Sequence, residues 1–199
     1  MWSGIWMWVL FSGTAAAFAG ENIRVAVCNM SRIPGSVIER AEDEAAHVFQ
    51  PMDVKIHWTD CGAEVGSKDA RTRPDFIVRL APGGQIAKVG PVSPEAMGRA
   101  FMDRTGYGFM VDAYYGAIHQ LTLSYPIASE GQVLGYTIAH ELGHLLIGPG
   151  HRPEGIMRAS WGRNEVDAIF HRFLYFNKAE SILIVRRLRM RRSSSSAIP

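Results

Sequence analysis

Short segments in which apolar and polar residues alternate predict β-strands, because successive side chains of a strand point to opposite faces of a sheet. In residues 22–28 the apolar positions are Ile23, Val25 and Val27. Residues 54–58 alternate in the same way. The remaining predicted strands are residues 76–80, 98–102 and 109–115.

Apolar residues at helical spacing predict helices in the intervals between these strands. Residues 37–49 have this pattern, and Pro51 ends it. The clearest helix spans residues 129–147, where Ser129 and Gln132 fit a capping box. The Gly-Pro-Gly run that follows stops this helix. Two further helices are predicted at residues 116–123 and 164–176.

The strand, helix, strand succession in residues 22–58 predicts two parallel strands joined by a right-handed crossover. Such a crossover brings Cys28 and Cys61, the two cysteines of the chain, close together. In an exported protein a pair of this kind forms a disulfide. Two reduced, buried cysteines are the alternative.

The chain has 199 residues, which suits one domain with a single core.

The first nineteen residues have the composition of an export signal. Residues 5–11 are almost entirely apolar, and Ala17-Phe18-Ala19 fits the small-x-small rule for signal-peptidase cleavage. No lysine or arginine precedes the apolar run. We predict a cleaved signal at residues 1–19 and a secreted or extracytoplasmic protein, with a membrane anchor or a buried terminal segment as alternatives.

Charge is distributed unevenly along the chain. Without five arginines near the C-terminus, the formal net charge falls from +2 to −3, so the body is mildly acidic. We therefore expect no nucleic-acid partner. No internal segment is long and apolar enough to span a bilayer, so we also expect no stable membrane insertion once the signal is removed. The basic, serine-rich tail at residues 181–199 is predicted to be disordered. The five arginines are Arg186, Arg187, Arg189, Arg191 and Arg192.

The strongest chemical signal is the H-E-x-x-H motif His140-Glu141-Leu142-Gly143-His144, inside the clearest predicted helix. Histidines four residues apart lie on one helix face, so both imidazoles can bind the same metal ion. Glu141 is then placed to take a proton from a water that zinc has acidified. The alternative is an amphipathic helix that turns these polar residues to solvent. It explains the motif poorly, because Leu142, Leu145 and Leu146 surround the two histidines.

A catalytic zinc needs three protein ligands, and His151 is the best third candidate because it follows a glycine turn that can reverse the chain. Residues 140–151, followed by Gly155-Ile156-Met157, resemble the metzincin zinc peptidases. The resemblance implies a zincin-like α+β fold over residues 20–180, with a mixed, mostly parallel twisted sheet, an active-site helix and a small C-terminal helical part. It also implies zinc held by His140, His144 and His151, Glu141 as general base, Gly148 as the turn glycine and Met157 as the methionine turn.

The spacing departs from that family at one point. Three residues, not two, separate His144 from Gly148, so His151 is displaced by one position. A rival third ligand is Glu165, at the head of the next predicted helix, as in the gluzincin peptidases. Glu154 is a weaker rival.

The predicted activity is that of a zinc metalloendopeptidase acting on peptides or proteins. A metal-activated water attacks the carbonyl, and Glu141 serves as base. Two alternatives stay open. The first is a non-catalytic secreted zinc-binding or interaction domain, although a purely structural site has no need of Glu141. The second is a zinc amidohydrolase acting on an amide other than a peptide bond.

Overall fold

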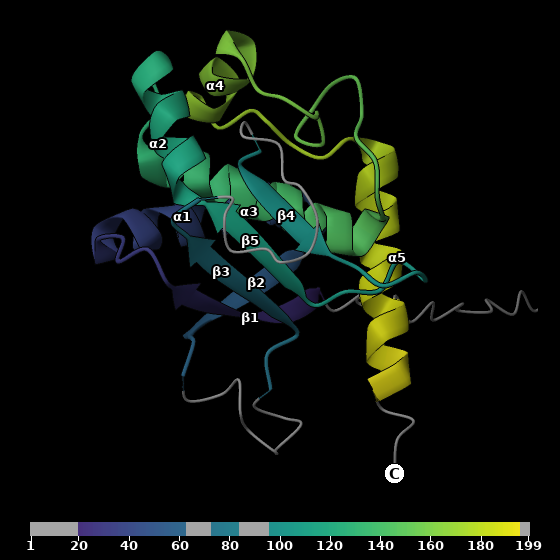
Figure 1. The fold of residues 1–199 in the computed structure, drawn as a ribbon. Helices are drawn as coiled ribbons and strands as arrows, with labels where there is room; N and C mark the ends of the chain where they lie inside the picture. Colours follow the sequence, from purple (N-terminus) through teal and green to yellow (C-terminus); the bar gives the residue numbers. More distant parts are fainter. Residues whose placement is uncertain (1–19, 63–72, 84–95, 196–199) are drawn as a thin grey trace, which may run out of the picture.

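A five-stranded sheet forms the centre of the computed structural model, which describes residues 20–62, 73–83 and 96–195. The predicted signal at residues 1–19 lies outside the described residues. The strand order is β2-β1-β3-β5-β4, and only β4 runs antiparallel to its neighbour (Figure 1). This confirms the predicted mixed, mostly parallel sheet. The strands are β1 (Glu21–Asn29), β2 (Val54–Asp60), β3 (Phe76–Ala81), β4 (Gly98–Phe101) and β5 (Met110–Tyr114).

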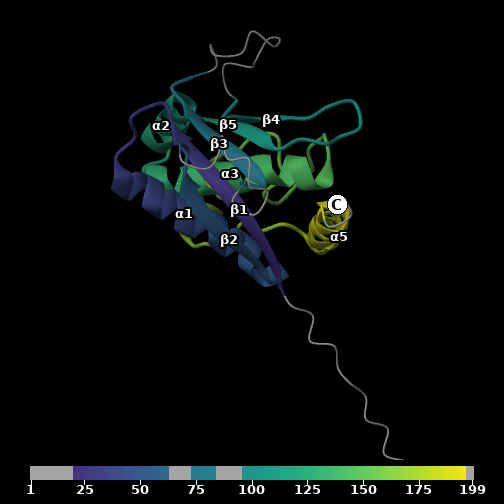
Figure 2. The same cartoon turned by 90° about the horizontal axis from the view of Figure 1, so that it is seen from below.

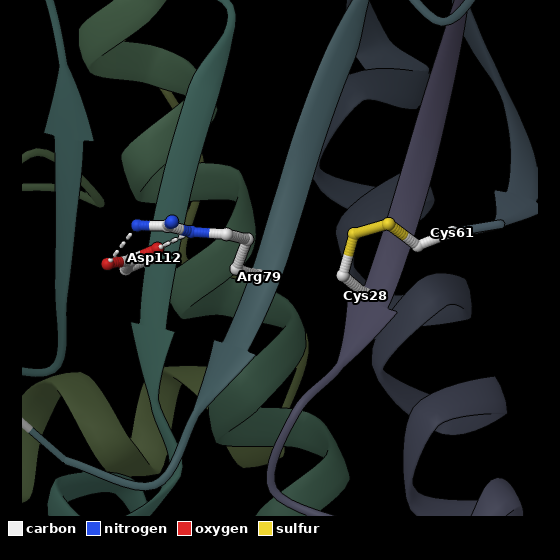
Figure 3. Close-up of a disulfide and its surroundings, with 4 residues drawn as sticks. All are labelled: Cys28, Cys61, Arg79 and Asp112. Atoms are coloured by element: carbon white, nitrogen blue, oxygen red, sulfur yellow. Dashed lines mark hydrogen bonds and ion pairs between the residues drawn. A yellow bond between two sulfur atoms is a disulfide. The ribbon is translucent and has the colours of Figure 1, made fainter. Parts of the chain in front are cut away.

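The helices α1 and α3 cover one face of this sheet (Figures 1 and 3). They pack closely on each other at Gly135, where an added Cβ would lie 2.5 Å from the carbonyl oxygen of Ala41. α5 stands beside the C-terminal half of α3, as Figures 1 and 2 show. The helices are α1 (Gly35–Phe49), α2 (Tyr115–Ser124), α3 (Glu130–Ile147), α4 (Arg163–Phe170) and α5 (Lys178–Ser195), with a 3-10 turn at Gln50–Met52.

α3 begins and ends where the sequence predicts. Ser129 and Gln132 form the capping box: the backbone N–H of Gln132 donates to the Ser129 hydroxyl, and the Gln132 side chain accepts from the Ser129 backbone N–H. Gly148 ends the helix with φ 109°, a conformation that favours glycine. Almost every residue between these ends is buried, so α3 is the central helix of the core.

The opposite face of the sheet carries a disulfide and a charged pair (Figure 3). Cys28 at the end of β1 is bonded to Cys61 just after β2, as the parallel crossover predicts. On β3 and β5, Arg79 and Asp112 are direct neighbours in register and form a two-point contact, with N–O distances of 2.6 and 2.9 Å. The disulfide thus links the ends of β1 and β2, and the charged pair links β3 to β5.

Two predicted elements differ from the structure. The helix predicted at residues 164–176 ends at Phe170, because Arg172 adopts φ 61°. The tail predicted to be disordered is helical through Ser195, so the predicted domain end at residue 180 falls inside α5. The helix forms because Ile184 and Leu188, one turn apart, are buried in the core.

Among the described residues, no helix is long and apolar enough to cross a membrane.

Candidate metal centre

His140 and His144 lie one turn apart on α3 and face each other. Their Nε2 atoms are 3.1 Å apart, and each residue is only 8% exposed. The separation follows directly from the i, i+4 spacing of the motif. Two imidazole nitrogens that both carry lone pairs repel each other at this distance, unless a proton or a cation lies between them.

Hydrogen bonds at the far side of each ring orient these nitrogens. Nδ1 of His140 is 2.7 Å from the carbonyl oxygen of Ile156, and Nδ1 of His144 is 3.3 Å from that of Gly148. A carbonyl only accepts, so each Nδ1 carries the proton and donates it, and each Nε2 keeps its lone pair. Backbone carbonyls that orient histidines in this way are typical partners of metal ligands.

Burial also keeps both rings neutral. The pKa of His140 is lowered to about 4, chiefly by burial; the hydrogen bond to Ile156 opposes this shift, and the nearby His144 and His151 contribute to it. Burial likewise lowers the pKa of His144. Neutral imidazole is the form that binds metal, so neither ring has to lose a proton near pH 7.

His151 approaches the same point from the loop after α3. Its ring lies 5.4 Å from that of His140 and 4.9 Å from that of His144, measured between centroids. Gly148 and Gly150 have φ of 109° and 98°, so the turn has the freedom to absorb the one-residue-longer spacing. The structure thus brings the three predicted histidines together despite that departure.

The three rings offer ligand atoms that all lie within 4.8 Å of one another. Within the described part of the chain, no other three His, Cys, Asp or Glu residues come together like this. Tetrahedral zinc with Zn–N bonds of about 2.0–2.1 Å separates its ligand nitrogens by roughly 3.3 Å. The spacing between His140 and His144 fits that value, and the all-nitrogen donor set suits zinc.

Glu141 is almost fully buried next to this cluster. Its Oε1 atom lies 4.0 Å from Nε2 of His140, and its side chain is 7% exposed. The pKa of Glu141 is raised to about 8, chiefly by burial; a hydrogen bond from the backbone N–H of Ala100 opposes this shift, and the nearby Asp112 contributes to it. A carboxyl group with a pKa near neutrality can both accept and donate a proton.

The edge strand β4 passes directly over Glu141. A Cβ added to Gly98 would lie 2.6 Å from the Cγ and Oε1 atoms of that side chain, so any larger residue there would have to displace Glu141. Nothing in the sequence pattern around Gly98 signals this contact, which depends on the packing of β4 over α3. Gly98 therefore joins the site through a contact that only the structure reveals.

Met157 lies beneath the helix that carries the histidines. A Cβ on Gly143 would lie 2.8 Å from the Met157 sulfur and 2.8 Å from an edge carbon of Phe176. Met157 is 1% exposed, and its carbonyl oxygen accepts from the backbone N–H of Arg152 at 2.8 Å. The residue predicted as a methionine turn thus forms the floor under α3.

A cleft of about 260 Å³ opens beside the cluster. Trp161, which follows the methionine segment, forms one wall and meets the ring of His140 edge-on, with centroids 5.8 Å apart. Trp161 is buried and at the same time lines the cleft. The other lining residues are Ala96, Met97, Gly98, Thr137, His140, Glu141, His151, Arg158, Ala159 and Ser160.

Neither rival ligand belongs to the cluster. Glu165 accepts a hydrogen bond from the backbone N–H of Gly162 at 2.8 Å, as the capping residue of α4. Its other oxygen lies 2.6 Å from a guanidinium nitrogen of Arg158. Glu154 is exposed. Both oxygens of Glu165 are therefore engaged elsewhere, which favours His151 as the third ligand.

Comparisons with known proteins find relatives by structure only. Neither protein-family models nor curated protein sequences match the chain. An archaemetzincin from Methanopyrus kandleri matches with a TM-score of 0.52 and 21% identity, over 88% of this chain and 99% of that chain. Metalloproteinase-II from Bacteroides fragilis matches with a TM-score of 0.51 and 14% identity, over 87% of this chain and 55% of that one. At these identities the likeness shows a shared fold, that of an archaemetzincin and a metalloproteinase.

Proposed function

We propose that the protein is a zinc-dependent metallopeptidase, with His140, His144 and His151 as metal ligands and Glu141 as general base. The observation that carries this proposal is the position of the Glu141 carboxylate, buried 4.0 Å from Nε2 of His140 at the edge of the three-histidine cluster. A site that only held the fold together would have no use for a buried carboxyl group there. The shared fold with an archaemetzincin and a metalloproteinase supports the same reading.

The residues of the site account for hydrolysis as follows. When bound, zinc supplies a Lewis acid that polarises a carbonyl and acidifies water. Glu141 takes the proton of the attacking water and returns it to the leaving amine nitrogen. The N–H of Ala100 holds the carboxylate in place, and next to a divalent cation this carboxylate ionises more readily than in the metal-free protein.

The edge strand β4 is a suitable place for an extended substrate. In the described sheet β4 pairs only with β5, so its other edge has main-chain groups available to a peptide. A peptide added there as a further strand would run along the wall of the cleft at Gly98, next to Glu141. Recognition through main-chain hydrogen bonds suits a peptide better than a small amide.

The disulfide between Cys28 and Cys61 supports a location outside the cytoplasm.

The test compares the zinc-loaded wild type with Glu141→Gln on an unfolded protein and on a library of quenched fluorescent peptides. We expect peptide cleavage by the wild type and a loss of about 100- to 10,000-fold in Glu141→Gln, with zinc content unchanged. Glu165→Gln, which changes a carboxylate outside the cluster, serves as the matched control and retains activity.

Two other results would replace the proposal. Equal turnover by the wild type and Glu141→Gln would exclude Glu141 as the base. Zinc bound at one equivalent with no cleavage of any peptide would favour a binding domain. If the same protein then hydrolysed a small amide in a Glu141-dependent way, the site would belong to an amidohydrolase.

A further inference from the structure

The third histidine of the cluster differs from the other two in how it is held. His140 and His144 are buried and each donates a hydrogen bond to a backbone carbonyl. The His151 side chain is exposed, and among the described residues it makes ring contacts but no hydrogen bond. Its position therefore depends on the backbone of its own loop, which follows two glycines with positive φ.

The next residue, Arg152, anchors that loop at its backbone. Its N–H donates to the carbonyl oxygen of Met157 at 2.8 Å, and Arg152 pairs with Arg158 in an isolated bridge. Residues 152–158 thus close into a small loop whose far end is the buried methionine under α3. The guanidinium of Arg152 also donates to the carbonyl oxygen of His151 at 3.3 Å.

The side chain of Arg152 is directed to α5. Its Nε atom lies 3.8 Å from Oε1 of Glu180, whose side chain is 2% exposed. The other oxygen of Glu180 accepts from the backbone N–H of Asn177 at 2.8 Å, while Oε1 is buried without a hydrogen bond. A buried carboxylate is costly unless a cation faces it, so the pair resists separation.

We propose that Arg152 is a positioning residue of the metal site, held by the buried carboxylate of Glu180 so that His151 stays at the ligand cluster. This inference rests on the proposed zinc site. It makes the first turn of α5, where Glu180 lies, a part of the support for that site. Residues that orient metal ligands typically affect metal affinity by about 10- to 100-fold when they are changed.

The experiment measures zinc affinity by competition with a chelator in the full-length protein. We expect Arg152→Gln and Glu180→Gln each to bind zinc about 10- to 100-fold more weakly than the wild type, and Arg152→Lys to recover part of the loss. The matched control is Arg40→Gln. Arg40 is similarly exposed and pairs with another fully buried carboxylate, Glu44, on α1.

Two further readouts separate positioning from general stability. Thermal unfolding of each metal-free variant reports any loss of fold. The visible absorption of Co²⁺ in the site reports ligand number and geometry, and should change in Arg152→Gln but not in Arg40→Gln. If Arg152→Gln folds poorly, Glu180→Gln provides the same comparison from the other side of the pair.

The outcomes are distinct. Equal zinc affinity in the wild type, Arg152→Gln and Glu180→Gln would overturn the positioning role and leave the proposed function intact. An equal loss of affinity in Arg40→Gln would also overturn it, because any weakening of the fold would then suffice. Absence of zinc binding by the wild type would remove the proposed function, and with it this inference.

Discussion

Nδ1 of His140 lies 2.7 Å from the carbonyl oxygen of Ile156, the residue before the methionine under α3. This contact joins the two conspicuous segments of the sequence, the H-E-x-x-H helix and the Gly-Ile-Met turn. It fixes the ring so that Nε2 faces His144, because a carbonyl oxygen can only accept and Nδ1 must therefore keep its proton. Two segments separated by the His151 loop thus build one side of the cluster together.

The first prediction concerns the protonation of His140 in the metal-free protein. Because burial lowers its pKa to about 4, we expect the neutral Nδ1–H form to persist from pH 7 down to about pH 4. Nitrogen-15 NMR of the imidazole distinguishes this form from the Nε2–H form and from the cation. A ring that becomes doubly protonated near its ordinary pKa of 6.5 would contradict the geometry described above.

The second prediction uses the opposite shift at Glu141. Burial, with Asp112 nearby, raises its pKa to about 8 from an ordinary value of 4.5. Between pH 4.5 and 8 the folded metal-free protein holds a proton that the unfolded chain releases, so this group lowers the free energy of unfolding as the pH rises. Glu141→Gln lacks this group. Its stability relative to the wild type should therefore increase from pH 4.5 to pH 8, on the order of a few kcal/mol.

Denaturant unfolding at several pH values in the presence of a chelator measures this difference. Glu39→Gln, an exposed carboxylate on α1, controls for the loss of one negative charge and should follow the wild type. If the Glu141→Gln and wild-type curves stayed parallel across this pH range, the carboxyl group would not be held in a buried, protonated state.

The third prediction concerns the floor of the site. Gly143→Ala places a methyl group where the Met157 sulfur and the Phe176 ring already lie 2.8 Å away. We expect a loss of about 1–3 kcal/mol in stability, typical of overpacking, together with weaker zinc binding as α3 shifts. Gly35→Ala at the exposed start of α1, where a Cβ meets nothing within 4 Å, is the control. Unchanged stability in Gly143→Ala would show that the methionine does not support the helix.

Much of the site could be predicted because its signals are local. The spacing of His140 and His144 places them on one helix face whatever the rest of the fold does. The capping box at Ser129 and the stop at Gly148 are likewise set by neighbouring residues, and the structure has both. The pairing of Cys28 with Cys61 follows from a single strand–helix–strand crossover.

The features that were missed depend on distant contacts. A basic run with few apolar residues gives little sign of a helix, and α5 is held instead by burial of Ile184 and Leu188 and by Arg191. The Arg191 guanidinium lies over the ring of Phe76, 5.0 Å from its centroid, and donates to the carbonyl oxygen of Gly108 at 2.7 Å. Such partners cannot be inferred from the tail itself. The fit of Gly98 over Glu141 is of the same kind, since it exists only once β4 is packed on α3.

The most direct test of the account is zinc binding at equilibrium by the purified protein and by two histidine variants. His151→Ala removes the proposed third ligand, whereas His171→Ala removes an exposed histidine outside the cluster. We predict one zinc per chain in the wild type and in His171→Ala, and a loss of at least about 10-fold in affinity in His151→Ala. Wild-type zinc affinity in His151→Ala, or no zinc in the wild type after reconstitution, would contradict a three-histidine metal centre.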